Sequence, residues 1–349
     1  MKFELLRALF GIFIAVASII CILLYIIIQK IIVSDRALIK YSTYKIVLCY
    51  GFIDIIQLCV YICNGIFAIF GTTIHGWIEK ICGFQLSFCW YNIDCLTILL
   101  AINRLTLLCF GVRAEHFFNP RMTSFILFFT IAIPSVFSVI WLTPKATYGF
   151  NAELLMWIYD SPDFMPTYDR ITTLLTSILS TACYILLLGF VLKKSSSTNK
   201  KMHDSSRRRD TLLTLQVIIN GGYTVCVSTY FMFLRPYYVP YTVIYNALDI
   251  LLCLLWNGKS PIMHLFFNRY IRTKFFEDIR DRKIFSLVLN VLLCLRHKIF
   301  SPPNHTSVNG FPLNRRISLK ENNIEGDHCS PELKQTFAIT TKTTAKVDV

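Results

Sequence analysis

Seven segments of this chain are each long and apolar enough to cross a lipid bilayer. A membrane-spanning helix needs roughly 20 mostly apolar residues. With 54% hydrophobic and 16% charged residues, the chain carries more apolar surface than one soluble core can bury. We therefore predict an all-α membrane protein built as a seven-transmembrane helix bundle. The predicted spans are Ala8–Ile28, Ile46–Phe70, Phe84–Leu108, Met122–Leu142, Ile171–Leu192, Thr211–Leu234 and Tyr241–Phe266.

Basic residues are distributed unevenly between the connections of these spans. The loops after the first, third and fifth spans hold fourteen Lys and Arg residues, whereas the amino terminus and the other three loops hold six. Because cytoplasmic loops carry the excess of basic residues, we expect a plasma-membrane protein with an extracellular amino terminus and a cytoplasmic carboxyl terminus. The net charge of +14 is then a topology signal, and no nucleic-acid partner is predicted.

The chain is expected to have four parts. Residues 1–7 form a short extracellular terminus, and residues 8–266 form the bundle. Residues 267–300 begin with alternating aromatic and basic side chains, a pattern typical of an amphipathic helix lying at the membrane interface. Residues 301–349 have the composition of a disordered cytoplasmic tail. Because the outer terminus is so short, an external ligand is expected to enter between the helices.

The third span is predicted to be central in the bundle. It is apolar along its length but carries Asn92 and Asp94 near its middle. A charged side chain at membrane depth costs a few kcal/mol, so Asp94 is expected to face protein rather than lipid. A helix with such a residue belongs inside the bundle.

Four polar side chains from four spans are expected at a similar depth. With a rise of about 1.5 Å per residue, each lies roughly 13–15 Å from the cytoplasmic end of its helix. Unpaired charges at that depth are costly, so Lys259 is predicted to neutralise one of two aspartates. The layer is either a static polar clasp between helices or a conformational switch. Its members are Asp54, Asp94, Asn220 and Lys259.

Two features predict a ligand pocket near the outer surface. The connection from Thr143 to Arg170 is either a solvated loop or a lid, with prolines marking its turns. Asp249 lies about 12 Å below the outer end of its helix; it either binds a cation or is satisfied by Tyr241 or Tyr245. The aromatic candidates have bundle packing as their alternative role. The candidate ligand-binding residues are Trp90, Tyr91, Tyr230, Tyr245 and Asp249.

The sequence shows no signature of an enzyme. Its seven histidines form no HxxxH or HExxH cluster, and no GxSG or GxGD pair occurs. No CxxC pair is present either, so we expect no catalytic residues, metal or cofactor. A cation channel or transporter is the alternative to a receptor, since Asp54, Asp94 and Asp249 could line an ion path. Against it, no inverted repeat is visible.

Four stretches carry a resemblance to a known family. They are YKIVLCYGFIDIIQL from Tyr44, WYNIDCLTILLAINR from Trp90, DTLLTLQVIINGGYTVCVSTYFMF in the sixth span and NGKSPIMHLFFNRYIR from Asn257. Together they resemble the nematode serpentine chemoreceptors of class T, a branch of the G-protein-coupled receptors. The resemblance implies a rhodopsin-like helix arrangement, an unknown small-molecule ligand and a heterotrimeric G protein as partner.

The resemblance also implies roles for single residues. Arg104, after Asn103, is similar to the arginine that contacts the G protein in rhodopsin-like receptors, and Asp54 to their mid-membrane aspartate. Pro261 belongs to a segment similar to their seventh-span switch. The basic loop with Arg207, Arg208 and Arg209 is expected to contact an acidic partner or anionic lipid.

Several departures from the family pattern change these expectations. Asn103 replaces the usual acidic residue, so the usual ionic lock cannot form. The loop between spans four and five offers no cysteine for the usual disulfide, and the sixth span lacks an internal proline. Because Lys259 lies beside the expected sodium position, we predict that it pairs with Asp54 and holds the resting state.

Overall fold

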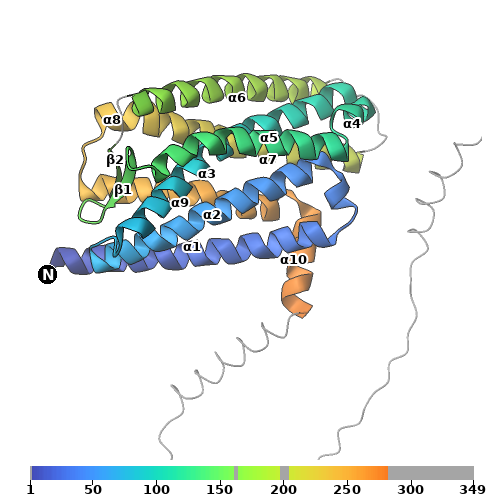
Figure 1. Ribbon diagram of the computed structural model, residues 1–349. Helices are drawn as coiled ribbons and strands as arrows, with labels where there is room; N and C mark the ends of the chain where they lie inside the picture. The colour runs from blue at the N-terminus through green and yellow to red at the C-terminus, as the bar shows by residue number, and fades with distance from the viewer. Residues whose placement is uncertain (1, 161–163, 197–203, 282–349) are drawn as a thin grey trace, which may run out of the picture. The chain divides into compact units, whose positions relative to one another are not determined.

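The computed structural model describes residues 2–160, 164–196 and 204–281 (Figure 1). In this part of the chain seven long helices are apolar enough to cross a membrane, as predicted. They run side by side with alternating direction (Figure 1). The long helices are α1 (Lys2–Ser34), α2 (Ser42–Phe70), α3 (Gly76–Phe110), α5 (Pro120–Ser138), α6 (Phe164–Ser196), α7 (Asp204–Thr229) and α9 (Val243–Phe267).

Shorter elements join or extend these helices. Two of them, η4 and α8, continue α7, so that the sixth span runs over Thr211–Tyr238. The short elements are η1 (Leu38–Lys40), η2 (Gly111–Arg113), α4 (Ala114–Phe117), η3 (Val139–Leu142), β1 (Thr147–Asn151), β2 (Met156–Asp160), η4 (Tyr230–Leu234), α8 (Arg235–Tyr238) and α10 (Arg269–Asp281).

The helices extend beyond the predicted spans, which were bounded by hydrophobicity alone. Helix α3 begins at Gly76 rather than Phe84, because the His75 ring nitrogen Nδ1 caps it by accepting a hydrogen bond from the Trp77 N–H at 3.2 Å. The sixth span also continues past its predicted end and includes Pro236, which follows the π-helical turn η4. The predicted span Thr211–Leu234 holds no proline, and Pro236 lies only two residues from the end of the longer span.

Helix α3 is the central helix of the bundle. It contacts α2, α5, α6, α7 and β1. Its apolar side chains Cys89, Ile93 and Leu96 are fully buried in a core cluster that includes residues of α2, α6 and α9. Asp94 is only 6% exposed, as the cost of a lipid-facing charge requires.

Helices α1 and α2 pack with their backbones in close approach. A Cβ atom added at Gly11 would lie 2.5 Å from the Gly65 carbonyl oxygen, and one added at Gly65 would lie 2.5 Å from that of Gly11. Small residues at such crossings let membrane helices gain van der Waals contact without a hydrophobic driving force. This pair positions α1 against the rest of the bundle.

The two ends of the bundle carry different structures (Figure 1). At one end, here named the hairpin end, β1 and β2 pair antiparallel with Thr147 opposite Asp160 and Asn151 opposite Met156. At the other, named the α10 end, Ile271 and Phe275 of α10 pack against α1, as expected for an amphipathic helix after the last span. The rest of the predicted interfacial segment, residues 282–300, and the predicted tail, residues 301–349, lie outside the described residues.

Candidate functional site

A cavity of about 590 Å³ lies beneath the hairpin. Its walls come from α2, α3, β1, β2, α6, η4, α8 and α9. Of the two alternatives for the connection between spans four and five, a solvated loop or a lid, these lining residues favour the lid. A pocket of this volume falls within the range of about 300–1,000 Å³ that is typical of small-molecule sites. The lining is mostly aromatic and aliphatic, with a few polar groups.

The hairpin is fastened to the bundle by hydrogen bonds. Glu79 at the start of α3 accepts one from the Phe150 N–H at 2.8 Å through Oε1. Asn246 of α9 donates one to the Leu154 carbonyl oxygen at 2.6 Å. Gly83 lies so close to the hairpin that an added Cβ would be 2.1 Å from the Tyr148 carbonyl oxygen. These contacts hold the lid without a disulfide.

Three of the five predicted ligand residues line this cavity, namely Trp90, Tyr91 and Asp249. Trp90 meets the Trp256 ring edge-on at 5.0 Å between ring centres. Tyr230 does not line the cavity but donates a hydrogen bond to Asp249 at 2.7 Å. Tyr245 does not line it either and is 44% exposed.

Asp249 forms an ion pair that sequence reasoning missed. Its Oδ2 accepts a hydrogen bond from Arg235 Nε. Arg235 also donates to the Asn246 side chain and, at 2.7 Å, to the Val239 carbonyl oxygen. Asp249 is thus satisfied by Arg235 and by Tyr230 rather than by Tyr241 or Tyr245, and its binding of an external cation stays a prediction. Since Arg235 was placed in a loop beyond the sixth span, no spacing pointed to the pair.

Asp169, near the start of α6, is a carboxylate of the cavity that was not predicted. It is 5% exposed, lines the cavity and accepts a hydrogen bond from the Tyr91 hydroxyl through Oδ1. Its position in the predicted outer loop concealed it, because α6 begins at Phe164 rather than at Ile171. The extended helix is what turns this side chain toward the pocket.

The predicted polar layer divides into separate networks. Asp54 is 1% exposed and accepts a hydrogen bond from the Tyr25 hydroxyl, which also lies 2.7 Å from the Asn257 carbonyl oxygen. Asp94 accepts from Ser228 and Thr176, each at 3.3 Å. Each carboxylate thus accepts hydrogen bonds from hydroxyl groups on other helices: Asp54 of α2 from α1, and Asp94 of α3 from α6 and α7.

Lys259 does not form the predicted ion pair with Asp54. Among the described residues its ammonium group donates to the Trp256 carbonyl oxygen at 2.7 Å and lies 5.0 Å from the Tyr223 ring centre. A backbone carbonyl and an aromatic face together stabilise a lysine at this depth. Asn220 accepts a hydrogen bond from Ser260 at 3.3 Å, next to Pro261 of the predicted switch.

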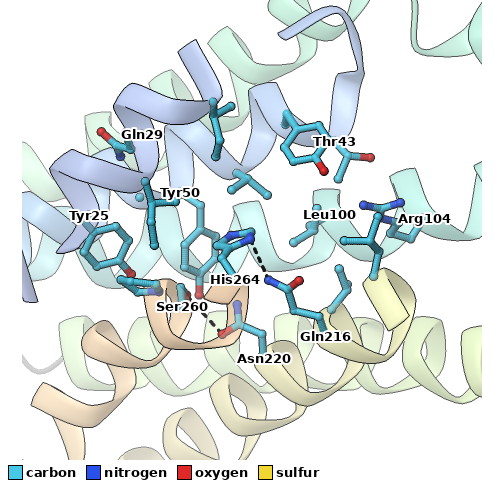
Figure 2. Close-up of a pocket in the computed structure, with 18 residues that line it drawn as sticks. Tyr25, Gln29, Thr43, Tyr50, Leu100, Arg104, Gln216, Asn220, Ser260 and His264 are labelled. Atoms are coloured by element: carbon cyan, nitrogen blue, oxygen red, sulfur yellow. Dashed lines mark hydrogen bonds between the residues drawn. The ribbon is translucent and has the colours of Figure 1, made fainter. Parts of the chain in front are cut away.

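The α10 end holds a much smaller cavity, of about 40 Å³ (Figure 2). Arg104 lies on one side of it, and His264 and Gln216 lie on the other (Figure 2). The His264 ring nitrogen Nδ1 and the Gln216 amide nitrogen are 3.0 Å apart, and their hydrogen bond joins α9 to α7. This contact was not predicted, because neither residue belongs to a polar pattern.

Asn103 replaces the usual lock with a different contact. Its amide donates to Ser42 Oγ at 2.8 Å and accepts from Thr43 Oγ1 at 2.7 Å, so it joins α3 to the start of α2. The predicted basic segment Arg207–Arg209 lies in α7, but these three side chains are outside the described part of the chain.

Comparisons with known proteins agree with this architecture. Residues 2–286 match the family described as serpentine type 7TM GPCR chemoreceptor Srt. The crystal structure of squid rhodopsin is similar in fold, with a TM-score of 0.60 and 16% sequence identity over 77% of this chain and 84% of that one. No curated protein matches the chain. A structural likeness at so low an identity shows the fold alone.

Proposed function

This chain belongs to the Srt family of serpentine seven-transmembrane G-protein-coupled chemoreceptors, and we propose that a small external ligand in its hairpin-end cavity shifts it to a state that activates a heterotrimeric G protein. The family and the fold are those of receptors rather than enzymes. The proposal includes a plasma-membrane location, with the hairpin end outside the cell and the α10 end inside.

The observation that carries this proposal is the pair of cavities at opposite ends of one bundle. The larger, of about 590 Å³, is big enough for a small molecule, and α2, α3 and α9 contribute to its walls. The same three helices contribute to the small cavity beside Arg104. A ligand that changes the packing of these helices at one end therefore alters the other.

The small cavity at the α10 end supports the interpretation that this structure is the resting state of the proposed receptor. A space of about 40 Å³ is far too small for a segment of another protein, so coupling through Arg104 requires the helices to separate there. To move the population from 1:99 to 99:1, the ligand must prefer the open form by about 5.5 kcal/mol. Contacts across a largely apolar pocket are the source of that preference.

The test is expression of the receptor with a chemical panel and a G-protein activation readout. For an activating compound, Arg104→Ala is expected to abolish activation while ligand binding is retained. Arg113→Ala is the matched control, because Arg113 is an exposed arginine just beyond α3 and should leave activation unchanged. Equal activation by the Arg104 variant and the wild type would contradict the proposal.

The channel alternative is tested by recording ligand-evoked current in cells that lack G proteins. Asp249 is paired with Arg235, and Asp54 and Asp94 each accept hydrogen bonds from hydroxyl groups. Because these three carboxylates belong to separate networks, we expect no such current. A current that persists without G proteins would favour the channel.

A further inference from the structure

Four charged side chains line the hairpin-end cavity, namely Asp169, Arg170, Arg235 and Asp249. The Arg235–Asp249 pair is internally satisfied, because both carboxylate oxygens accept hydrogen bonds and the guanidinium also donates to backbone and amide oxygens. Arg170 places its guanidinium carbon 5.6 Å from the ring centre of Tyr237. Asp169 differs from these three in its surroundings.

Within the part of the chain that the structure describes, the Asp169 carboxylate is buried without a counter-cation. It is 5% exposed, and Tyr91 donates a hydrogen bond to its Oδ1. Among the described residues, no ion pair reaches Asp169 and no donor reaches its Oδ2. Holding a carboxylate in such a site is costly unless a cation or further donors compensate it. The cavity beside it has room for a molecule that supplies both.

Gln57 adds a second unsatisfied group to the same cavity. The side chain is 1% exposed, its amide nitrogen donates to the Tyr61 hydroxyl at 3.3 Å, and its Oε1 has no hydrogen-bond partner. Because an amide can present either its oxygen or its nitrogen to a ligand, Gln57 indicates a polar contact but not the charge of the ligand. The Asp169 carboxylate indicates that this charge is positive.

Aromatic side chains line the same cavity as this carboxylate. The rings of Tyr148 and Tyr159 stack with their centres 4.4 Å apart, and Trp157 lies 5.2 Å from Tyr148. Burial raises the pKa of the Tyr159 phenol, and the neighbouring Tyr148 and Asp169 groups raise it further. These phenols therefore stay neutral, and their faces attract cations.

We propose that the hairpin-end cavity selects a small organic ammonium ion, whose N–H groups donate to Asp169 and whose carbon skeleton packs on the aromatic wall. This inference rests on the proposed receptor function and names its ligand class. A primary amine supplies a charge-assisted hydrogen bond and a cation–π contact together. An uncharged ligand supplies no charge to offset that of Asp169 and no cation–π contact, and a carboxylate ligand would be repelled.

Cys253 provides a probe of this cavity, since it lies in the cavity wall. Intact receptor in nanodiscs is treated with three methanethiosulfonate reagents of similar size, which carry an aminoethyl, a hydroxyethyl or a sulfonatoethyl group. Modification at Cys253 is measured by peptide mass spectrometry, and each rate is divided by the rate with 2-mercaptoethanol. The aminoethyl reagent is itself a small organic ammonium ion.

The cation is expected to react at least about tenfold faster than the neutral reagent, because one unit charge about 12 Å away already predicts that ratio at an effective dielectric constant of about 20. Asp169→Asn keeps an acceptor for Tyr91 and should abolish this advantage. Tyr91→Phe keeps the carboxylate and should retain it. The matched control Glu153→Gln removes a carboxylate of the hairpin that does not line the cavity and should also retain it.

Three results would overturn the proposal: equal rates for cation and neutral reagent, an undiminished advantage in Asp169→Asn, or no reaction at Cys253 with any reagent. The labelling needs no G protein, so its outcome is independent of signalling. A cation preference without G-protein activation by any amine would instead count against the receptor function. The two failures are therefore distinguishable.

Discussion

The hairpin end and the α10 end of this bundle use the same helices but differ in how much space they leave. The first encloses about 590 Å³ behind a lid, whereas the second encloses about 40 Å³. At the hairpin end a β-hairpin and the Arg235–Asp249 ion pair contribute to the cavity wall. At the α10 end hydrogen bonds between polar side chains join α2 to α3 and α7 to α9. In the proposed mechanism, ligand binding therefore needs little rearrangement, whereas coupling to a partner requires contacts to break.

The largest effect is expected from breaking the ion pair at the hairpin end. Arg235→Met leaves the Asp249 carboxylate buried without its cation, which should lower the free energy of unfolding by about 3–5 kcal/mol. Thermal unfolding in nanodiscs measures the change. The double variant Arg235→Met/Asp249→Asn removes both charges and should recover much of the loss. A double variant no more stable than Arg235→Met would show that packing, rather than charge, dominates there.

The next effect concerns the close contact between Gly83 of α3 and the hairpin. Gly83→Ala places a methyl group 2.1 Å from the position of the Tyr148 carbonyl oxygen, so the hairpin must shift. We expect destabilisation of about 1–3 kcal/mol and a weaker ligand response. Gly76→Ala is the control in the same helix, because an added Cβ there meets nothing within 4 Å. Equal behaviour of the two variants would mean that the hairpin is not seated on α3 as described.

A smaller effect is expected at the α10 end. Gln216→Leu removes the hydrogen bond to His264, and a single bond of this kind contributes about 0.5–1.5 kcal/mol. Basal G-protein activation should rise roughly two- to tenfold, because only the closed arrangement loses the contact. Gln29→Leu is the control, since Gln29 lines the same cavity but bonds Leu48 between α1 and α2. Unchanged basal activity in both variants would show that the Gln216–His264 hydrogen bond does not stabilise the closed arrangement.

The smallest effect concerns the attachment of α10. Hydrogen bonds from Tyr270 and from the Ala37 N–H lower the pKa of the Asp35 carboxyl. A lowered folded-state pKa means that the stabilisation is present above the ordinary value of about 3.9 and is lost as the pH falls through the folded pKa. Amide hydrogen exchange in α10 should therefore speed up only in that acidic range, and Tyr270→Phe should remove most of this pH dependence.

Much of the fold was predictable because membrane insertion makes strong demands on sequence. Seven apolar segments had to become helices, since a helix satisfies its own backbone hydrogen bonds in lipid. Asp94 had to face inward because a charged side chain exposed to lipid is costly. Of the predicted ligand residues, Trp90, Tyr91 and Asp249 line the cavity, whereas Tyr230 and Tyr245 do not. The roles of these residues in binding, and of Asn103 and Arg104 in coupling, stay predictions.

The missed residues have a common physical cause. Asp169 and Arg235 were predicted to lie in loops because Asp169 precedes its apolar span and Arg235 follows its own, although both helices extend over these residues. The polar layer failed for another reason. Depth along a helix says nothing about which way a side chain points, and Lys259 turned to a carbonyl and a ring rather than to Asp54.

By itself, the sequence determined the number of spans, the central place of α3 and the family, because these depend on hydrophobic length, on the cost of buried charge and on motifs carried along the chain. The tertiary structure alone decided which buried charges meet and where space remains. Pairing depends on helix rotation and on distances of a few tenths of an ångström between segments far apart in the chain. That is why the Arg235–Asp249 pair and the unpaired Asp169 carboxylate emerge only once the helices are packed.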